Sequence, residues 1–507
     1  MSTSTPAKPA TDVVRSLVPA RMDRLPWSAF HWRMIIALGI TWILDGVEIG
    51  LASAIGDVLR HKETLELSTQ VVTLSGGLYL LGEVVGALYF GRQADRLGRR
   101  KLFIVTLALY LVANALTALS FSTWFFLLTR FVAGMGIGGE YAAIHSAIDE
   151  LTPARYRGRV DIAIAGTYWA GAMLAAVAQM LLLNPDVIPI DIGWRISLVL
   201  GPAIGLMIWP LRKYIPESPR WQLTHGQVAE AEATVDSIEA GIRARGIVIP
   251  PVDPAHAVVI RQREAVSYLR VLQVLFQQYG RRTVLSLGLM ITQSFLYNAI
   301  FFTFALILVD FYGVKQTSVF YYIFPFAFGN LLGPLLIGRF FDTIGRRKMI
   351  SLTYCSSALL LAASGWLFHK GALDATSQTV LWCVIFFIAS AAASSAYLTV
   401  SEIYPVEVRA QAISIIFAIA QSFGATAPPL FGWIISRAVN QETHVVLSRV
   451  PLALAYVGCA VVMFGGGLIA WFFGVDAEGK SLEDVAPPLS ATETPHVTPD
   501  PHEITQT

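Results

Sequence analysis

Gly91-Arg-Gln-Ala-Asp95-Arg-Leu-Gly98-Arg-Arg-Lys101 is a short charged stretch between two long apolar runs. The same pattern returns as Gly338-Arg-Phe-Phe-Asp342-Thr-Ile-Gly345-Arg-Arg-Lys348, again between two apolar runs. One polar hinge that occurs twice, about half the chain apart, predicts a duplicated helical bundle. Because the flanking runs are long and apolar, we expect this bundle to lie in a membrane.

Composition supports a membrane protein. The residues AVILMFWYC make up 55% of the 507 residues and charged residues 14%, whereas soluble domains carry about 25% charged residues. The net charge of +2 is too small to indicate a nucleic-acid partner. Cys355, Cys383 and Cys459 lie inside apolar runs without the spacing of a metal site or a disulfide framework, so no metal or other cofactor is expected.

The apolar runs predict an all-α polytopic membrane protein with twelve transmembrane helices in two six-helix bundles. The expected spans are 33–58, 70–90, 102–120, 122–148, 160–184, 194–212, 283–311, 317–338, 349–368, 378–402, 411–436 and 449–473.

The same pattern predicts five segments along the chain. They are an N-terminal tail (1–32), an N-terminal bundle (33–212), a linker with short helices (213–282), a C-terminal bundle (283–473) and a disordered tail (474–507). Lys and Arg concentrate in the N-terminal tail and in the gaps after the second, fourth, eighth and tenth spans. By the positive-inside rule, both termini and the linker are expected on the cytoplasmic side of an inner membrane.

A second motif also occurs twice. Glu150-Leu-Thr-Pro153-Ala-Arg-Tyr-Arg157 ends the fourth span, and Glu402-Ile-Tyr-Pro405-Val-Glu-Val-Arg409 ends the tenth. Two ordered repeats indicate two related halves, and transporters built in this way place their substrate between the halves.

These paired motifs resemble those of the major facilitator superfamily over essentially the whole chain. Within that superfamily, Arg130–Gly139, Pro216–Trp221 and Gly479–Asp484 are similar to the metabolite–proton symporter and sugar-porter branches. The resemblance implies a secondary active transporter that works by alternating access, as a monomer, on a small molecule and a proton.

The repeated motifs predict the gating residues. Gly91 and Gly98 would allow close approach and tight turning, and Asp95 would face a helix N-terminus of the other half or accept a hydrogen bond from Arg157. Topology signals alone remain the alternative for the basic residues. The full predicted set is Gly91, Asp95, Gly98, Arg99, Glu150, Arg157, Gly338, Asp342, Gly345, Arg346, Glu402 and Arg409.

Intramembrane charges predict the proton-coupling residues. Asp45 and Glu48 lie three residues apart and therefore on one helix face. Counting residues from the ends of the spans places Asp45 and Arg130 at similar depth, which permits an ion pair that a proton would open. In the resembled branches, an Asp of the first span near the Arg of the fourth has this role. A permanent structural pair is the alternative. Glu140 is a second proton site, a substrate-orienting group or a partner of a neighbouring helix.

Other ionisable side chains are weaker candidates. Glu83 is as ambiguous as Glu140, and His145 fits a helix interface better than a proton relay.

Substrate contacts are expected from four spans, the fifth, seventh, eighth and eleventh. Gln293, Tyr297 and Asn298 interrupt an apolar helix, with a spacing similar to a sugar-binding segment of sugar porters. Ala165 stands where sugar porters carry a glutamine, and Tyr168 and Trp169 follow it, which favours a planar ligand over a hexose. Packing is the alternative role for these aromatic residues. Gln421 and Asn330 are further candidates.

Two nucleotide-like motifs are dismissed. Gly134–Gly139 fits G-x-G-x-x-G but lies inside an apolar helix, where small residues serve close helix packing. Gly474–Ser481 fits the Walker A spacing but follows the last span without a nucleotide domain. No nucleotide is expected.

The sequence therefore predicts proton-coupled symport of a small organic metabolite, with an organic or aromatic carboxylate favoured. A sugar or polyol symporter, a xenobiotic exporter and a non-transporting membrane sensor remain alternatives. An enzyme is not expected, because no catalytic constellation faces an aqueous domain.

Overall fold

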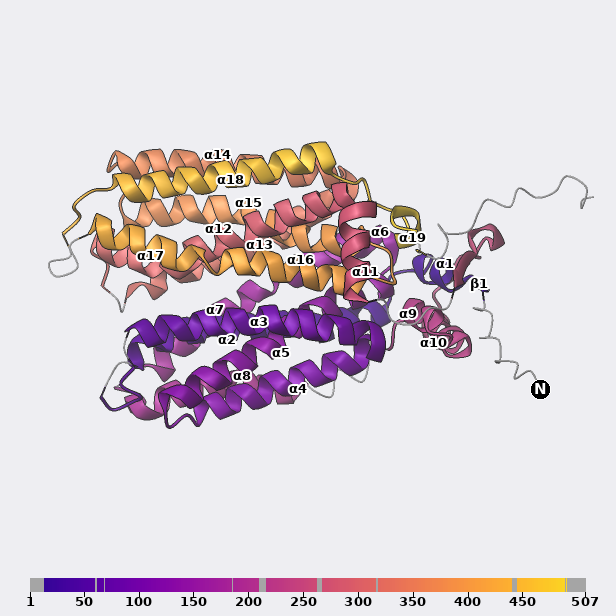
Figure 1. Ribbon diagram of the computed structural model, residues 1–507, viewed down its shortest axis with the longest axis horizontal. Coiled ribbons are helices and arrows are strands. Elements are labelled where there is room, and N and C mark those ends of the chain that lie inside the picture. Colours follow the sequence, from indigo (N-terminus) through magenta and orange to yellow (C-terminus); the bar gives the residue numbers. More distant parts are fainter. Residues whose placement is uncertain are drawn as a thin grey trace, which may run out of the picture.

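The computed structural model describes residues 13–59, 62–67, 69–184, 186–208, 216–261, 267–315, 318–439, 445–487 and 489. Two groups of long helices lie side by side along one axis (Figure 1). The N-terminal group comprises α2 (Ala29–Val58), α3 (Thr69–Leu97), α4 (Arg99–Ala118), α5 (Thr123–Leu151), α6 (Ala154–Gly166), α7 (Tyr168–Leu182) and α8 (Ile190–Ile208). The C-terminal group comprises α12 (Gly280–Tyr312), α13 (Phe320–Thr343), α14 (Arg346–His369), α15 (Ala375–Glu402), α16 (Arg409–Gly424), α17 (Ala427–Ala438) and α18 (Val450–Phe473).

The predicted all-α two-bundle membrane fold is confirmed, and each of the twelve expected spans coincides with helix over most of its described residues. Residues 209–212 of the sixth expected span and 317 of the eighth lie outside the described residues. Among the described residues, nine helical stretches are long and apolar enough to cross a membrane. The other three spans are α5, which carries Arg130 and Glu140, α8, and the interrupted pair α16 and α17. The fifth span begins earlier than expected, at Ala154, because Pro153 directly precedes the first helical turn.

The two halves meet through pairs of helices that the duplication relates. α3 packs on α16, while α6 and α7 pack on α13, and α5 lies against α15 and α16. The fifth and eleventh spans are both broken, the former at Thr167 and the latter at Ala425 and Thr426. Both breaks lie partway along the bundle, so they redirect the side chains that face the centre.

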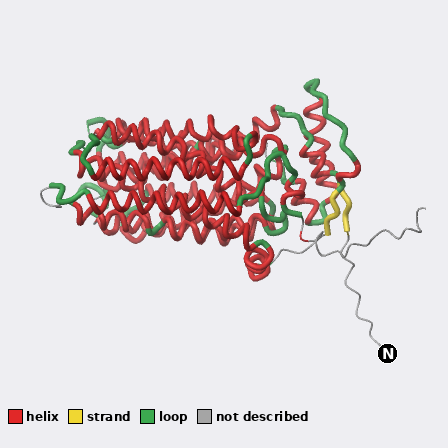
Figure 2. Tube along the Cα trace, turned by 90° about the horizontal axis from the view of Figure 1, so that it is seen from above, coloured by secondary structure: helices red, strands yellow, loops and turns green. Residues whose placement is uncertain are grey.

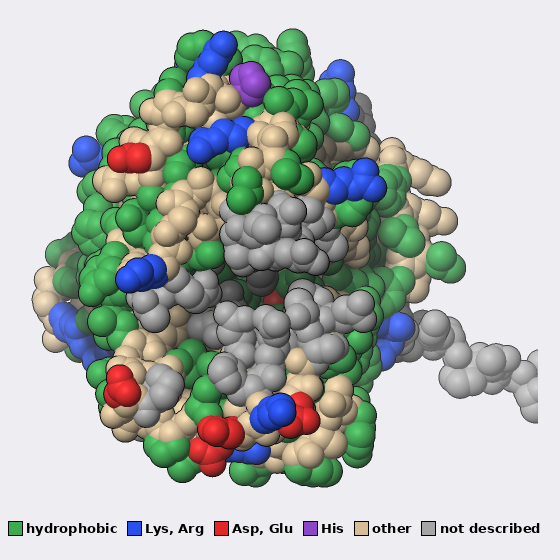
Figure 3. Space-filling model, turned by 90° about the vertical axis from the view of Figure 1, so that its left-hand side faces the viewer, with side chains coloured by type: hydrophobic (Ala, Val, Ile, Leu, Met, Phe, Trp, Pro, Cys, Tyr) green, Lys and Arg blue, Asp and Glu red, His purple; other side chains and the backbone are tan. Residues whose placement is uncertain are grey.

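The shorter elements gather at one end of the bundles, which we call the linker end (Figures 1 and 2). They are β1 (Val13–Ser16), α1 (Val18–Asp23), α9 (Pro219–Thr224), α10 (Val228–Arg243), the 3₁₀ turn η2 (Pro254–His256), β2 (Val258–Arg261), α11 (Tyr268–Gln273), the π turn η3 (Val274–Gln278) and α19 (Leu482–Val485). We call the opposite end the open end. Figure 3 shows that its face is hollowed near the centre.

The terminal segments are more ordered than the sequence predicts. β1 pairs with β2 in an antiparallel two-stranded sheet, with Val13 opposite Arg261. In α1, Val18 and Met22 are buried, and Leu482 and Val485 of α19 are buried as well. No local pattern indicates this order, because each segment is short and the surfaces that cover it lie elsewhere in the chain.

Candidate functional site

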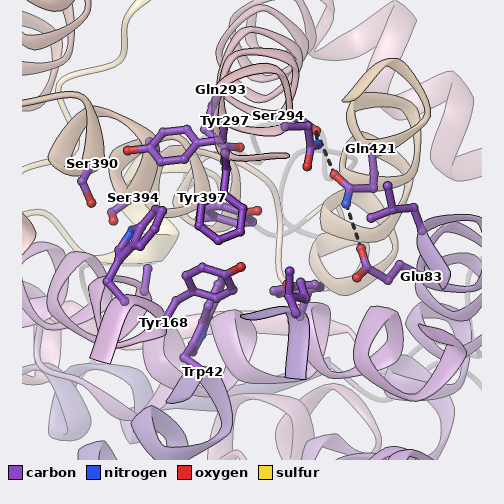
Figure 4. Close-up of a pocket in the computed structure, with 18 residues that line it drawn as sticks. Trp42, Glu83, Tyr168, Gln293, Ser294, Tyr297, Ser390, Ser394, Tyr397 and Gln421 are labelled. Atoms are coloured by element: carbon purple, nitrogen blue, oxygen red, sulfur yellow. Dashed lines mark hydrogen bonds between the residues drawn. The ribbon is translucent and has the colours of Figure 1, made fainter. Parts of the chain in front are cut away.

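A cavity lies between the two bundles and is lined by residues near the middle of α2, α3 and α12. Figure 4 shows the side chains around it. The volume open to water-sized molecules is about 120 Å³. Six of the seven residues considered as substrate contacts line it: Tyr168, Trp169, Gln293, Tyr297, Asn298 and Gln421. Their role in binding stays a prediction, which the experiments below test.

Aromatic rings from both bundles form much of the cavity wall. The ring centroids of Trp42 and Tyr141 are 5.0 Å apart, and Trp42 lies 5.6 Å from Tyr397. On another side, Trp169 lies 5.8 Å from Tyr297. The sequence did not single out Trp42, Tyr141 or Tyr397, since aromatic residues are frequent in its helices and nothing in their spacing shows that they converge.

The break in the fifth span positions two of these rings. The hydroxyl of Thr167 donates to the carbonyl oxygens of Ile164, at 2.5 Å, and Gly39, at 3.0 Å. The first bond closes the end of α6 and the second ties the break to α2. α7 then begins with Tyr168 and Trp169, which face the cavity.

A chain of hydrogen bonds connects the bundles along the cavity wall. Ser294 Oγ donates to Gln421 Oε1 at 2.8 Å, and Gln421 Nε2 donates to Glu83 Oε2 at 2.8 Å. Asn298 Nδ2 lies 3.4 Å from Ser294 Oγ. Figure 4 shows Glu83 reaching across from α3 toward Gln421 of α16. Asn330 is not among the lining residues, but its Oδ1 accepts from the Tyr297 hydroxyl at 3.2 Å.

Glycines of α5 set the position of Glu83. A Cβ atom at Gly134 would lie 2.0 Å from the carbonyl oxygen of Tyr79, and one at Gly138 would lie 2.0 Å from that of Glu83. α3 and α5 therefore pack backbone to backbone. This confirms the packing role predicted for Gly134–Gly139 in place of nucleotide binding.

The charged cluster of the N-terminal bundle differs from the prediction in one pair. Arg130 Nη1 donates to Glu48 Oε1, so Glu48 and not Asp45 is the partner of Arg130. Asp45 Oδ2 instead accepts a hydrogen bond from the Tyr141 hydroxyl at 2.6 Å. The guanidinium of Arg130 also lies 4.4 Å from the ring centroid of Tyr79.

Helix lengths explain this correction. The first span extends to Val58, so Glu48 lies ten residues and Asp45 thirteen residues from its open end, or ~15 Å and ~20 Å at 1.5 Å per residue. Arg130 lies seven residues into α5, at ~10 Å by the same measure. Glu48 is therefore closer in depth, and its side chain is longer by one methylene.

The remaining acids lie near this pair. Glu140 and Asp45 line a small second cavity with Thr41, Trp42 and Tyr141, and both acids are buried. Asp45 Oδ1 has no hydrogen-bond partner among the described residues. A buried carboxylate without a cationic partner is costly in its ionised form, so Asp45 is suited to bind and release a proton. The side chain of His145 lies outside the described residues.

At the linker end, the repeated motifs form ion pairs between the bundles. Glu150 of α5 lies 3.1 Å from Arg99 Nη2 and 3.8 Å from Arg409 Nη1 of the other half. Glu402 of α15 lies 2.9 Å from Arg346 Nη2 and 4.0 Å from Arg157 Nη1 of the other half. Each acid therefore has one partner in each bundle, and all of these side chains are buried.

The second copy of the opening motif crosses to the N-terminal bundle. Asp342 Oδ2 accepts from the backbone N–H of Arg159, near the start of α6, at 2.8 Å, and its Oδ1 lies 2.9 Å from Arg346 Nη1. Asp342 thus has the contact with a helix start that was predicted for Asp95. The side chain of Asp95 lies outside the described residues.

The glycines of both copies lie where the chain leaves little room. A Cβ at Gly91 would lie 1.8 Å from Ser414 Oγ of α16, and one at Gly338 would lie 3.0 Å from Ile162 of α6. Gly98 and Gly345 have φ of 89° and 115°, which a residue with a Cβ rarely adopts. They turn the chain from α3 into α4 and from α13 into α14.

Two glutamates, which the sequence analysis placed in motifs without assigning them a role, cap the helices after these turns. Glu217 Oε1 accepts from the backbone N–H of Arg99 at 2.7 Å, and Glu478 Oε2 accepts from that of Arg346 at 3.3 Å. A carboxylate at a helix N-terminus satisfies free N–H groups and the helix dipole. Burial raises the pKa of Glu217, against the effect of its hydrogen bonds with Ser218 and Arg99.

The terminal segments add a third group of ion pairs. Asp23 of α1 lies 3.1 Å from Arg157 Nη2 and 2.7 Å from Arg220 Nη2 of α9. Arg220 Nε also lies 2.9 Å from Glu483 Oε1 of α19. The Walker-like stretch before α19 therefore packs at the linker end with the repeated motifs.

Two related helical bundles with a central cavity lined by aromatic and amide side chains, buried acids beside it and one end closed by ion pairs are typical of a membrane transporter. The family model described as "Sugar (and other) transporter" matches residues 34–488. The chain belongs to this family, and the resemblance to a sugar-porter-like branch of the major facilitator superfamily is confirmed. It is a multi-pass membrane transporter and not an enzyme.

Relatives and solved structures agree with this assignment. The niacin transporter NiaP of Acinetobacter baylyi is 24% identical over 92% of this chain and 99% of its own length. The inner membrane metabolite transport protein YgcS of Escherichia coli is 25% identical over 92% and 96%, and polyol transporter 5 of Arabidopsis thaliana is 26% identical over 94% and 89%.

The fold matches a solved proton:xylose symporter, XylE bound to 6-bromo-6-deoxy-D-glucose. The TM-score is 0.72 at 18% identity, covering 90% of this chain and 98% of that chain.

Proposed function

We propose that the protein is a secondary active transporter that takes up a small planar organic metabolite together with a proton. The observation that carries this proposal is the position of Asp45. It is buried, it lacks a cationic partner among the described residues, and its hydrogen-bond partner Tyr141 lines the central cavity. Protonation of Asp45 would therefore change its hydrogen bond with Tyr141, and through Tyr141 it would change the cavity wall.

Transport then follows from alternating closure of the two ends. In this structure the linker end is closed by Glu150 with Arg409 and by Glu402 with Arg157. We place this end on the cytoplasmic side of the bacterial inner membrane, as the distribution of Lys and Arg predicts. Substrate and proton enter from the open end, and the buried ion pairs must separate before substrate leaves. A single chain contains both bundles and the whole cavity.

The cavity wall bears on the substrate class. Its rings suit a planar molecule, and the niacin transporter among the relatives acts on an aromatic compound. The amides of Gln293, Asn298 and Gln421 suit hydroxyl groups equally well, which makes polyol–proton symport the second candidate, in line with the polyol relative. An aromatic carboxylate, the substrate that the sequence favoured, finds no basic residue among those that line the cavity.

Uptake into proteoliposomes tests the proposal. Nicotinate, nicotinamide, xylose and myo-inositol are supplied with and without an inward proton gradient. We expect gradient-driven accumulation of at least one planar compound. Asp45→Asn should abolish accumulation but still equilibrate substrate across the membrane. Asp191→Asn, which alters an exposed acid at the start of α8, serves as the matched control. Accumulation by Asp45→Asn at the wild-type level would refute proton coupling through this residue.

A further inference from the structure

Two buried acceptor atoms in the cavity wall lack partners. Glu83 Oε1 and Gln293 Oε1 have no hydrogen-bond partner among the described residues, although both are shielded from solvent. Glu83 lies on α3 and Gln293 on α12, so the two atoms belong to opposite bundles. A buried acceptor that stays unpaired costs ~1–3 kcal/mol, so a ligand that donates hydrogen bonds to both atoms removes this cost.

The cavity also lacks a positive charge. None of the lining residues that the structure describes is Lys, Arg or His. Arg130 is not among them, and its guanidinium is held by Glu48 and by the ring of Tyr79. Among the described lining residues, Glu83 alone can carry a formal charge at neutral pH, so the charge of this lining is negative or zero. An anionic substrate would meet only this acid.

The rings complete a site of a recognised chemical type. Trp42, Tyr168, Tyr397 and Glu83 all line the cavity, and Figure 4 shows Glu83 beside Gln421, on another side from Trp42 and Tyr168. The π face of Trp or Tyr attracts a cation, and this attraction is worth ~0.5–2 kcal/mol, more when water is excluded. Aromatic faces with one carboxylate favour a cation over a neutral molecule of the same shape.

We infer that the transported metabolite is a planar nitrogen compound that carries a positive charge, and that Glu83 is the residue that selects it. This inference rests on the proposed transport function and assigns the substrate class of that cavity. The ring of the substrate packs among the aromatic side chains, and its positive nitrogen lies toward Glu83. A ring amide or amino group donates to Gln293.

The position of Glu83 also links substrate binding to the contact between the two bundles. Its Oε2 already accepts from Gln421 of α16, at 2.8 Å, and this bond joins the two halves. A cation that draws the Glu83 carboxylate toward the cavity competes with this bond. Substrate binding therefore weakens one link between α3 and α16 and replaces it with contacts of its own to both bundles.

The test compares three probes with one ring and three charges: the 1-methylnicotinamide cation (methylated on the ring nitrogen), neutral nicotinamide and the nicotinate anion. Binding to the purified protein in lipid nanodiscs is measured by calorimetry, without any gradient. For the wild type we expect the cation to bind about tenfold more tightly than the neutral amide, a difference of ~1.4 kcal/mol, and the anion to bind most weakly. Nicotinate that binds as tightly as the cation, or no saturable binding of the cation at millimolar concentration, overturns the inference.

Variants then locate the effect. Glu83→Gln should lose the tenfold preference for the cation and keep its affinity for nicotinamide, which also shows that the variant is folded. Glu63→Gln removes an exposed acid in the loop after α2 and should keep the wild-type preference. An unchanged preference in Glu83→Gln overturns the role of Glu83. Binding of the cation without proton-driven uptake would contradict the proposed function instead, so the two failures are distinguishable.

Discussion

The two bundles are alike at the linker end and unlike at the centre. At the linker end, Glu150 and Glu402 each contact one arginine from each half. In the centre, the N-terminal bundle buries Asp45, Glu48, Glu83 and Glu140 with Arg130. Among the described residues of α12–α18, the buried charged side chains are Arg346, Glu402 and Arg409, all at the linker end.

This difference indicates that two halves of common architecture have diverged at the centre and stayed alike at the linker end. The paired motifs at the linker end join the halves through ion pairs of the same kind in each half. The centre combines one half with buried charged side chains and one half with neutral amides and hydroxyls. In the proposed function, a substrate between them would contact both halves.

The strongest test of this asymmetry removes the charge that holds Arg130. Glu48→Gln leaves a buried guanidinium without its counter-ion, and we expect the free energy of unfolding to fall by about 3–5 kcal/mol. Denaturant unfolding in detergent micelles measures the change. Ser390→Ala, which removes a buried 2.7 Å hydrogen bond to the Asn330 carbonyl in the C-terminal bundle, should cost only about 1 kcal/mol.

A double variant checks the cause. Glu48→Gln combined with Arg130→Gln should recover part of the lost stability, because no unpaired charge then remains. If Glu48→Gln and Ser390→Ala lower the free energy of unfolding by the same amount, the buried charges of the N-terminal bundle do not contribute more to stability than a neutral hydrogen bond of the C-terminal bundle.

The symmetry of the linker end is tested through Asp342. Asp342→Asn weakens the bonds to the Arg159 N–H and to Arg346, and each charge-assisted bond is worth more than a neutral one. We expect the linker end to open about tenfold more often, a change of ~1.4 kcal/mol. The rate at which a maleimide modifies Ile162→Cys, buried between α6 and α13, reports this opening.

Two further variants complete this test. Asp476→Asn alters an exposed acid at the same end and should leave the labelling rate unchanged. Asp95→Asn should reduce turnover and leave substrate affinity in place, and it should raise the labelling rate as Asp342→Asn does. A rate that rises for only one copy would show that the two halves are not equivalent here.

Much of this arrangement could be predicted from the sequence. The two copies of the glycine–aspartate–arginine motif predicted two bundles, because the same polar spacing between apolar runs demands the same local structure. Helical spacing also brought Gln293 and Tyr297 to the face that lines the cavity.

The partners of the central charges could not be predicted in the same way. Asp45 and Glu48 differ in depth by about one helical turn, and this difference decides which of them pairs with Arg130. An error of a few residues in a predicted helix end is as large as that difference. The place of Glu83 depends on how closely α5 approaches α3, which is decided by tertiary packing of Gly134 and Gly138. The bond between Glu83 and Gln421 joins segments far apart in sequence, and no local pattern signals it.

The smallest expected effect concerns α1, which breaks the symmetry of the linker end. Glu239 of α10 accepts from Arg21 at 3.0 Å and from Arg24 at 2.7 Å, and it thereby holds α1. Burial acts to raise the pKa of Glu239, but the hydrogen bonds and charges of Arg21 and Arg24 outweigh it and lower the pKa to about 2. The docked carboxylate thus has a lower pKa than the released one, whose value is 4.5.

It follows that this carboxylate stabilises docking fully above pH 4.5, and that its contribution is lost as the pH falls from 4.5 through about 2. The distance between spin labels at Ala20 and Ala240 should therefore stay constant from neutral pH to 4.5 and lengthen below it. Glu239→Gln should show part of this lengthening at neutral pH, since a neutral amide holds two guanidinium groups less firmly. Lengthening that begins well above pH 4.5 would assign the release of α1 to a group other than Glu239.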